Sequence, residues 1–171
     1  MNFTAKKICY VAVFTAMNVM LSSLGIKVPG GNLYLNDIVI CFAALVLDPF
    51  SAFVVGGVGA FLGDLIFYPT PMFVSLFTHG FQAVAISLIV GKKDGIKPIF
   101  RVLIALFVGI IIMVGGYTLG KTFVYSTWEN AVLKLPYEFA QAGIGAIVSF
   151  ILYFKTPLPS FILKNLPKEE K

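Results

Sequence analysis

Residues 98–121, PIFRVLIALFVGIIIMVGGYTLGK, form an apolar run that decides the fold class of this chain. Arg101 and Lys121 are the only charged side chains in the run. A helix needs roughly 20 residues to cross the hydrocarbon core of a membrane, so this segment is long enough to span it. The run therefore predicts a transmembrane helix.

Similar apolar segments lie on both sides of this run, separated by Pro, Gly, Asn and charged residues: 7–24, 35–47, 50–68, 72–91 and 136–155. The 171 residues are 58% hydrophobic and 12% charged, whereas soluble domains average roughly 25% charged residues. We expect an all-α integral membrane protein, with residues 1–171 forming one compact bundle of six transmembrane helices. This leaves no room for a soluble domain, so any ATPase would lie on another chain.

The segment 35–47 is the shortest of the six. Its uninterrupted core, Ile38 to Leu47, is bounded by Asp37 and Asp48 and is short for a full span. It predicts a half-length or interior helix that pairs with the next segment, or alternatively a re-entrant hairpin over 35–68. The following break is clearer, because the two prolines of Tyr68-Pro69-Thr70-Pro71 force a turn.

The positions of the thirteen basic residues predict the orientation in the membrane. With the N-terminus inside, only Lys27, Lys121 and Lys134 fall on the outer side. The other ten fall on the cytoplasmic side: Lys6, Lys7, Lys92, Lys93, Lys97, Arg101, Lys155, Lys164, Lys168 and Lys171. This asymmetry places both termini in the cytoplasm of a multi-pass plasma-membrane protein. It also argues against nucleic acid as the partner behind the net charge of +5.

Lys6 and Lys7 precede an apolar run, as in a signal peptide, but Ile8 to Leu24 is long for a signal core. We expect a retained first helix. Cys9 and Cys41 both lie in apolar segments and are expected to be small core residues without a disulfide or redox role.

A complete phosphate-loop pattern, GGYTLGKT, occupies residues 115–122. The motif works between a strand and a helix of a soluble α/β domain, a context that this chain does not offer. We therefore expect its glycines to ease helix packing and Lys121 to extend to the outer interface.

Few polar side chains fall at membrane depth, and such groups are functional candidates. Apart from Asn18, all of them are expected in the outer half, where they predict a pocket open to the outside: Asp64, His79, Gln82, Glu138 and Gln141. His79 and Gln82 share one helix face, and so do Glu138 and Gln141.

Structural alternatives exist for three of these side chains. Glu138 follows Pro136 at a predicted helix start, where a carboxylate is favoured by the helix dipole. His79 could make an ordinary interhelical hydrogen bond, and Asp64 could pair with His79 or with a loop lysine.

Two outer loops could fold over such a pocket. The first, residues 25–35, contains Asn32 and Tyr34, and the second, residues 122–135, contains Trp128. The alternative is that both are ordinary connections whose aromatic side chains anchor at the membrane interface.

The sequence gives no sign of an enzyme, a metal site or a cofactor. The single histidine has no partner at metal-binding spacing, and no nucleophile motif is present.

Taken together, the chain resembles the S components of energy-coupling factor (ECF) vitamin transporters over nearly its whole length. The resemblance rests on the A-x-x-x-A stripe of Ala12 and Ala16, on Gly31-Asn32-Leu33-Tyr34-Leu35-Asn36-Asp37, on Gly63-Asp64-Leu65 and on Pro136-Tyr137-Glu138-Phe139.

The resemblance implies a non-catalytic subunit that captures a water-soluble vitamin and delivers it to a transmembrane coupling protein energised by two cytoplasmic ATPase subunits. It implies that Ala12 and Ala16 dock on the coupling protein and that Asn32 and Tyr34 belong to a lid.

The residues around the predicted pocket suit a small hydroxylated aromatic ring, and the sequence looks closest to members that handle pyridoxine or hydroxymethylpyrimidine. No arginine is expected near the outer side, which disfavours folate and phosphate esters. A stand-alone facilitator or channel and a structural membrane scaffold are the alternatives.

Overall fold

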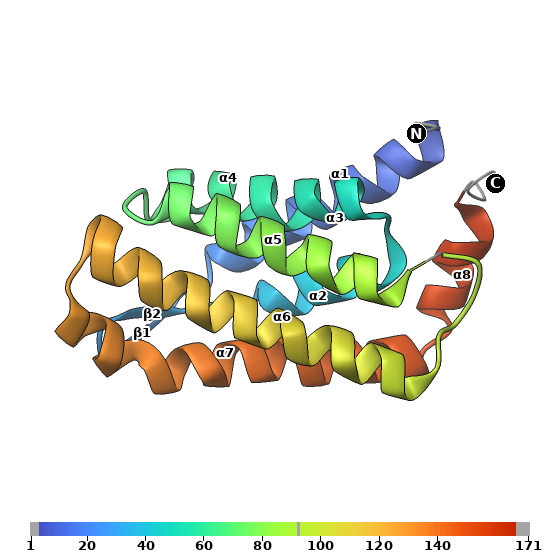
Figure 1. Ribbon diagram of the computed structural model, residues 1–171. Coiled ribbons are helices and arrows are strands. Elements are labelled where there is room, and N and C mark those ends of the chain that lie inside the picture. The colour runs from blue at the N-terminus through green and yellow to red at the C-terminus, as the bar shows by residue number, and fades with distance from the viewer. Residues whose placement is uncertain (1–3, 92, 167–171) are drawn as a thin grey trace.

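The computed structural model describes residues 4–91 and 93–166, which form seven continuous helices and one β-hairpin (Figure 1). The hairpin consists of β1 (Ile26–Val28) and β2 (Gly31–Leu33). Five helices are uninterrupted: α1 (Ala5–Ser22), α2 (Asp37–Val46), α5 (Met72–Val90), α7 (Trp128–Lys155) and α8 (Leu158–Asn165). The other two include a π-helical segment. In one, α3 (Pro49–Phe53) continues through η1 (Val54–Val58) into α4 (Gly59–Phe67), and in the other, α6 (Ile99–Gly120) continues into η2 (Lys121–Tyr125).

In the part of the chain that the structure describes, four helices are long and apolar enough to cross a membrane: Pro49–Phe67, Met72–Val90, Ile99–Tyr125 and Trp128–Lys155. The all-α membrane fold is confirmed, but six full spans are not found among the described residues. α2 has only 10 residues, and α1 carries Lys6 and Lys7 in its first turn. The bundle thus combines four long apolar spans with two less typical helices.

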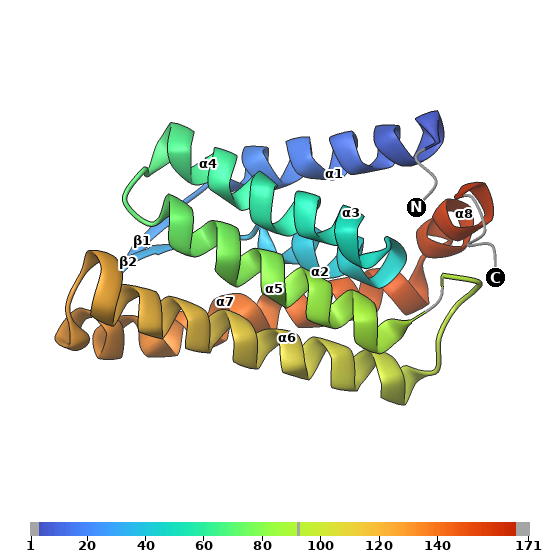
Figure 2. The same cartoon turned by 45° about the horizontal axis from the view of Figure 1, so that its top comes forward.

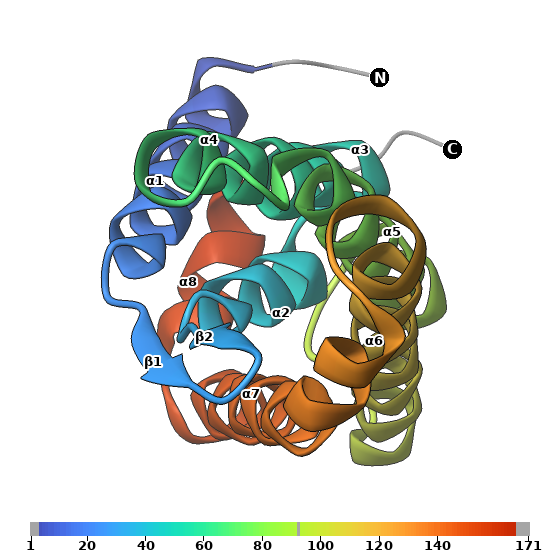
Figure 3. The same cartoon turned by 90° about the vertical axis from the view of Figure 1, so that its left-hand side faces the viewer.

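α2 lies in the middle of the bundle, surrounded by the longer helices (Figure 3). All of its residues except Ile38 are buried. A short helix that is apolar on every side is stable only when other helices cover it. The interior position predicted for the segment 35–47 is therefore correct.

Two predicted helix boundaries on the outer side are wrong. The segment 98–121 continues as a helix to Tyr125, and the last long helix begins at Trp128 instead of at residue 136. Thr127 caps this helix, because its side chain accepts a hydrogen bond from the Asn130 N–H at 3.4 Å. Pro136 consequently lies inside α7, which membrane helices tolerate when neighbouring groups satisfy the freed backbone. The predicted loop over 122–135 is reduced to Ser126 and Thr127.

Small and polar residues fit α1 closely against the α3–α4 helix. The side chain of Asn18 donates to the carbonyl of Val55 at 2.6 Å, in the segment where π-helical geometry alters the regular backbone bonding. A Cβ atom on Gly59 would come within 2.7 Å of Asn18 Nδ2. The glycines of this helix thus serve internal packing.

The start of α1 and the short helix α8 lie at the same end of the bundle, and the hairpin lies at the other end (Figures 1 and 2). Of the ten basic residues predicted on the cytoplasmic side, Lys92, Lys168 and Lys171 lie outside the described residues. Lys7 forms an ion pair with Asp48 at 2.7 Å. Partial burial alone would raise the pKa of Asp48, but the Lys7 ammonium and the hydrogen bond from the Ser51 N–H outweigh it and lower that pKa.

Candidate functional site

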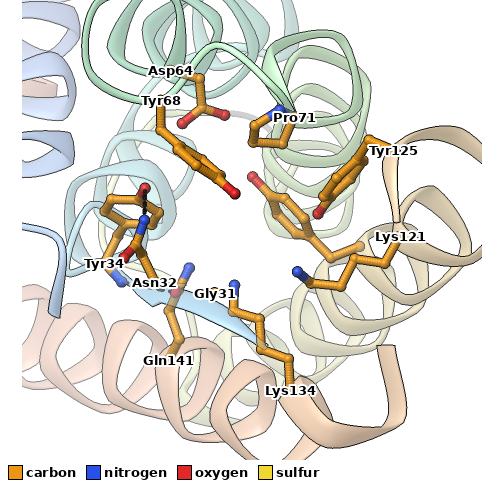
Figure 4. A pocket seen from close by; sticks show the side chains of 11 residues that line it. Gly31, Asn32, Tyr34, Asp64, Tyr68, Pro71, Lys121, Tyr125, Lys134 and Gln141 are labelled. Atoms are coloured by element: carbon orange, nitrogen blue, oxygen red, sulfur yellow. Dashed lines mark hydrogen bonds between the residues drawn. The ribbon is translucent and has the colours of Figure 1, made fainter. Parts of the chain in front are cut away.

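A cavity opens at the hairpin end of the bundle, between β2, the α4–α5 turn, the α6–η2 helix and α7 (Figure 4). It encloses about 330 Å³ of empty space, counted to its open mouth. Its lining combines four tyrosines with a few charged and amide groups: Gly31, Asn32, Tyr34, Asp64, Tyr68, Pro71, Tyr117, Lys121, Tyr125, Lys134 and Gln141.

The hairpin covers one side of this cavity, and its tip contacts two helices. Lys121 Nζ donates to the carbonyl oxygen of Gly30 at 2.9 Å. Gly30 adopts a φ of 80°, and a Cβ atom there would lie 2.9 Å from both the Asn130 carbonyl oxygen and Lys134 Cβ. Only glycine fits this combination of backbone angle and close approach.

The acidic side of the cavity is formed by Asp64, which is 6% exposed. The hydroxyl of Ser75 donates to the Asp64 carboxylate, and the same hydroxyl lies 2.5 Å from the hydroxyl of Tyr117. Three helices thus contribute to one small polar cluster.

The basic sides of the cavity are formed by Lys121 and Lys134, which are each 5% exposed. Both ammonium groups point into the cavity in Figure 4. Lys134 Nζ lies 2.9 Å from Glu138 Oε1, one helical turn away. This contact is an ion pair by distance only, because no described group donates a hydrogen bond to either Glu138 oxygen. Lys121 instead lies over the ring of Tyr125, 5.2 Å from its centroid.

A chain of buried hydrogen bonds leads from the cavity into the centre of the bundle. The N–H of Tyr34 donates to Gln141 Oε1 at 2.9 Å, and Gln141 Nε2 donates to Asp37 Oδ2 at 2.7 Å. Gln82 Nε2 donates to Asp37 Oδ1 at 3.0 Å. His79 Nδ1 lies 2.7 Å from Gln82 Oε1, and because an amide oxygen can only accept, Nδ1 carries the proton.

Four of the predicted binding residues line the cavity: Asn32, Tyr34, Asp64 and Gln141. Burial of Tyr34, whose hydroxyl accepts from Asn32 Nδ2 at 3.2 Å, raises its pKa. The other three, His79, Gln82 and Glu138, do not line the cavity. His79 and Gln82 connect to the lining through Asp37 and Gln141, and Glu138 connects to it through Lys134.

Three of the structural alternatives can be judged from these contacts. Glu138 does not cap a helix start, because α7 begins ten residues before it, at Trp128. His79 bonds within its own helix, three residues along. Asp64 has no ion-pair partner within 4 Å among the described residues and bonds to Ser75 instead.

Asp37, the two lysines of the cavity and three of its tyrosines are not among the predicted binding residues. Lys121 does not extend to the membrane interface, because it lies on the inward face of a helix that continues past it. The spacing of Tyr117, Lys121 and Tyr125 at four-residue intervals is a signal for that face. Lys134 was assigned to a loop, whereas α7 aligns it with Glu138 and Gln141 on one buried face.

The phosphate-loop pattern at 115–122 lies within the continuous α6–η2 helix. A helix offers no loop whose N–H groups could surround a phosphate, so its dismissal as a nucleotide site is supported by the structure.

Known proteins resemble this chain in both fold and sequence. The solved S component of a bacterial ECF transporter superimposes with a TM-score of 0.68, covering 92% of this chain and 97% of that chain at 16% identity. The thiamine precursor transporter HmpT of Lactococcus lactis subsp. cremoris (strain MG1363) is 30% identical over 156 residues, which are 88% of this chain and 87% of that protein. An uncharacterized protein of Pyrococcus woesei is 30% identical over 135 residues, covering 78% of this chain and 88% of that protein.

The protein family described as the S component of the ECF-type riboflavin transporter matches residues 2–156. This match covers most of the chain. The helical membrane fold and the cavity at one end of the bundle agree with it. The chain therefore belongs to the S components of ECF transporters, which are non-catalytic, multi-pass membrane subunits that act in vitamin uptake together with an ECF module.

Proposed function

We propose that this S component captures a small hydroxylated heteroaromatic vitamin or precursor, with hydroxymethylpyrimidine and pyridoxine favoured, in the cavity at the hairpin end. The observation that carries the proposal is the lining of this cavity, in which Tyr34, Tyr68, Tyr117 and Tyr125 surround a few buried polar groups. Tyrosine faces stack on a flat ring, and the polar groups give directed hydrogen bonds. The identity of 30% to a thiamine precursor transporter supports the same ligand class.

The cavity faces the outside of the cell in this proposal. The described basic residues of the predicted cytoplasmic set lie at the start of α1, in the loop between α5 and α6, at the start of α6, at the end of α7 and in α8. Positive residues concentrate on the cytoplasmic side of membrane proteins, so the hairpin end faces outward.

The chain docks through α1 on a transmembrane coupling protein, which two cytoplasmic ATPase subunits energise. Ala12 and Ala16 are both exposed, and they lie one turn apart on the same face of α1. Small residues at this spacing allow another helix to approach closely.

Equilibrium binding to the purified chain tests this function. We expect hydroxymethylpyrimidine or pyridoxine to bind in the nanomolar range without ATP, measured by calorimetry against a panel that includes thiamine, riboflavin and folate. Absence of binding by every member of the panel would refute the proposal. Liposomes that contain this chain alone should show no appreciable ligand flux, whereas rapid flux would favour a facilitator. If the chain were a structural scaffold, replacing His79 or Glu138 would lower its stability without changing any ligand affinity.

Gly30→Ala should accelerate ligand dissociation about 10-fold, because a side chain at this φ strains the backbone and displaces the hairpin from α7. Stopped-flow measurement of the dissociation rate would detect the change. Gly143→Ala is the control, since a Cβ atom there meets no other atom within 4 Å. An unchanged rate in Gly30→Ala would contradict a covering role for the hairpin.

A further inference from the structure

Two oppositely charged side chains in the cavity have no ion-pair partner among the described residues. Lys121 is 5% exposed and Asp64 is 6% exposed, yet neither has a group of opposite charge within 4 Å in the described part of the chain. Lys134 differs, because Glu138 compensates its charge at 2.9 Å. Burying a charge without an opposite charge beside it is costly, so a ligand is the natural source of the missing compensation.

Both side chains also keep hydrogen-bonding capacity that no group within residues 4–91 and 93–166 uses. The ammonium of Lys121 has three N–H donors, and one of them bonds to the Gly30 carbonyl. The carboxylate of Asp64 accepts from Ser75 and has room for further donors. In Figure 4, Asp64 lies on the α4 side of the cavity, and Lys121 extends into the same space from η2.

The balance of charge restricts the kind of ligand that fits. A monoanion would compensate Lys121 but would leave Asp64 alone, and a monocation would do the reverse. A ring that carries a cationic N–H on one side and an anionic oxygen on the other compensates both groups at once.

We propose that Lys121 and Asp64 select a zwitterionic heteroaromatic ring of the 3-hydroxypyridine class, to which pyridoxine belongs, over an aminopyrimidine. This inference rests on the proposed function and narrows it. In such a ring the pyridinium N–H donates to Asp64, and the ring oxygen, as the phenolate, accepts from Lys121. An aminopyrimidine offers N–H donors to Asp64 but no anionic oxygen to Lys121.

A double comparison of ligand and protein tests this assignment. Affinities of the wild-type chain and of Lys121→Met are measured by calorimetry for pyridoxine and for its analogue without the 3-hydroxyl group. We expect loss of the hydroxyl to weaken binding to the wild type about 10- to 100-fold, as for a hydrogen bond between charged groups. Lys121→Met should weaken pyridoxine binding to a similar extent and the analogue by less than about threefold.

Control variants separate this effect from a change in folding. Lys155→Met removes an exposed lysine at the opposite end of the bundle and should leave both affinities unchanged. Lys121→Arg keeps the charge and should keep a preference for the ligand with the hydroxyl group.

The comparison of pyridoxine with its analogue on the wild-type chain tests the inference even if Lys121→Met fails to fold. Equal affinity of the wild type for pyridoxine and its analogue would overturn the inference, and so would tighter binding of hydroxymethylpyrimidine than of pyridoxine. The proposed function would survive either result, because it fails only if the whole vitamin panel does not bind.

Discussion

Replacing Ala16 with tryptophan is expected to abolish vitamin uptake by the assembled transporter while leaving the ligand affinity of the isolated chain unchanged. Ala16 is exposed on α1, a helix that contributes no residue to the lining of the cavity. An indole there would hold a partner helix away from the stripe of Ala12 and Ala16. A central contact of an interface is worth about 2 kcal/mol or more, so uptake should fall roughly 30-fold or further.

Uptake of labelled ligand into cells and co-purification of the ECF module measure this effect, and calorimetry on the purified variant measures affinity. Ile147→Trp is the matched control, because Ile147 is 62% exposed on α7 and lies outside the α1 stripe. Normal uptake by Ala16→Trp would remove α1 from the docking surface. A parallel loss of uptake and affinity would instead indicate a damaged bundle.

Replacing Asp37 with alanine is expected to destabilise the chain and to weaken ligand binding together. Asp37 is fully buried at the start of the interior helix α2, where it accepts hydrogen bonds from Gln82 and Gln141. Without it, two buried amide groups lose their acceptor, at about 1–3 kcal/mol each. Gln141 would also lose the contact that orients it toward the N–H of Tyr34 at the cavity. We expect a fall of about 2–6 kcal/mol in the free energy of unfolding.

Thermal denaturation in detergent and calorimetry with the vitamin panel check this prediction. Asp37→Asn keeps the shape and one acceptor oxygen, so it should fold more stably than Asp37→Ala while still binding ligand less tightly. Asp94→Ala serves as the control, because the Asp94 side chain is 68% exposed in the loop between α5 and α6. If Asp37→Ala kept wild-type stability, the hydrogen-bond chain would not hold the bundle centre together.

The positions of the apolar segments could be predicted because burial in hydrocarbon depends mainly on the length and continuity of an apolar run. The interior place of α2 also followed from its shortness and its flanking aspartates. The ends of the helices near the cavity could not be predicted in this way. Residues 122–135 contain polar groups typical of a loop, yet a threonine cap and a proline tolerated within α7 keep most of them helical.

The candidate site was predicted only in part, for a related reason. Asp64 and Gln141 could be selected because polar residues within a membrane bundle are rare. Asn32 and Tyr34 were selected because the resemblance to S components implies a lid in the first outer loop. Lys121 and Lys134 were overlooked because a lysine near a helix end normally extends its ammonium group to the membrane surface. In the folded chain both lysines are buried, one against a backbone carbonyl of the hairpin and the other against Glu138.

The sequence by itself determined that this chain is an all-α membrane protein with few polar groups at one end, because hydrophobic run length and charge asymmetry are properties of the chain alone. Only the tertiary structure decided which polar groups meet. Small changes in helix length rotate every following side chain around the helix axis, so a boundary that shifts by a few residues moves a lysine from the lipid interface to the wall of a cavity.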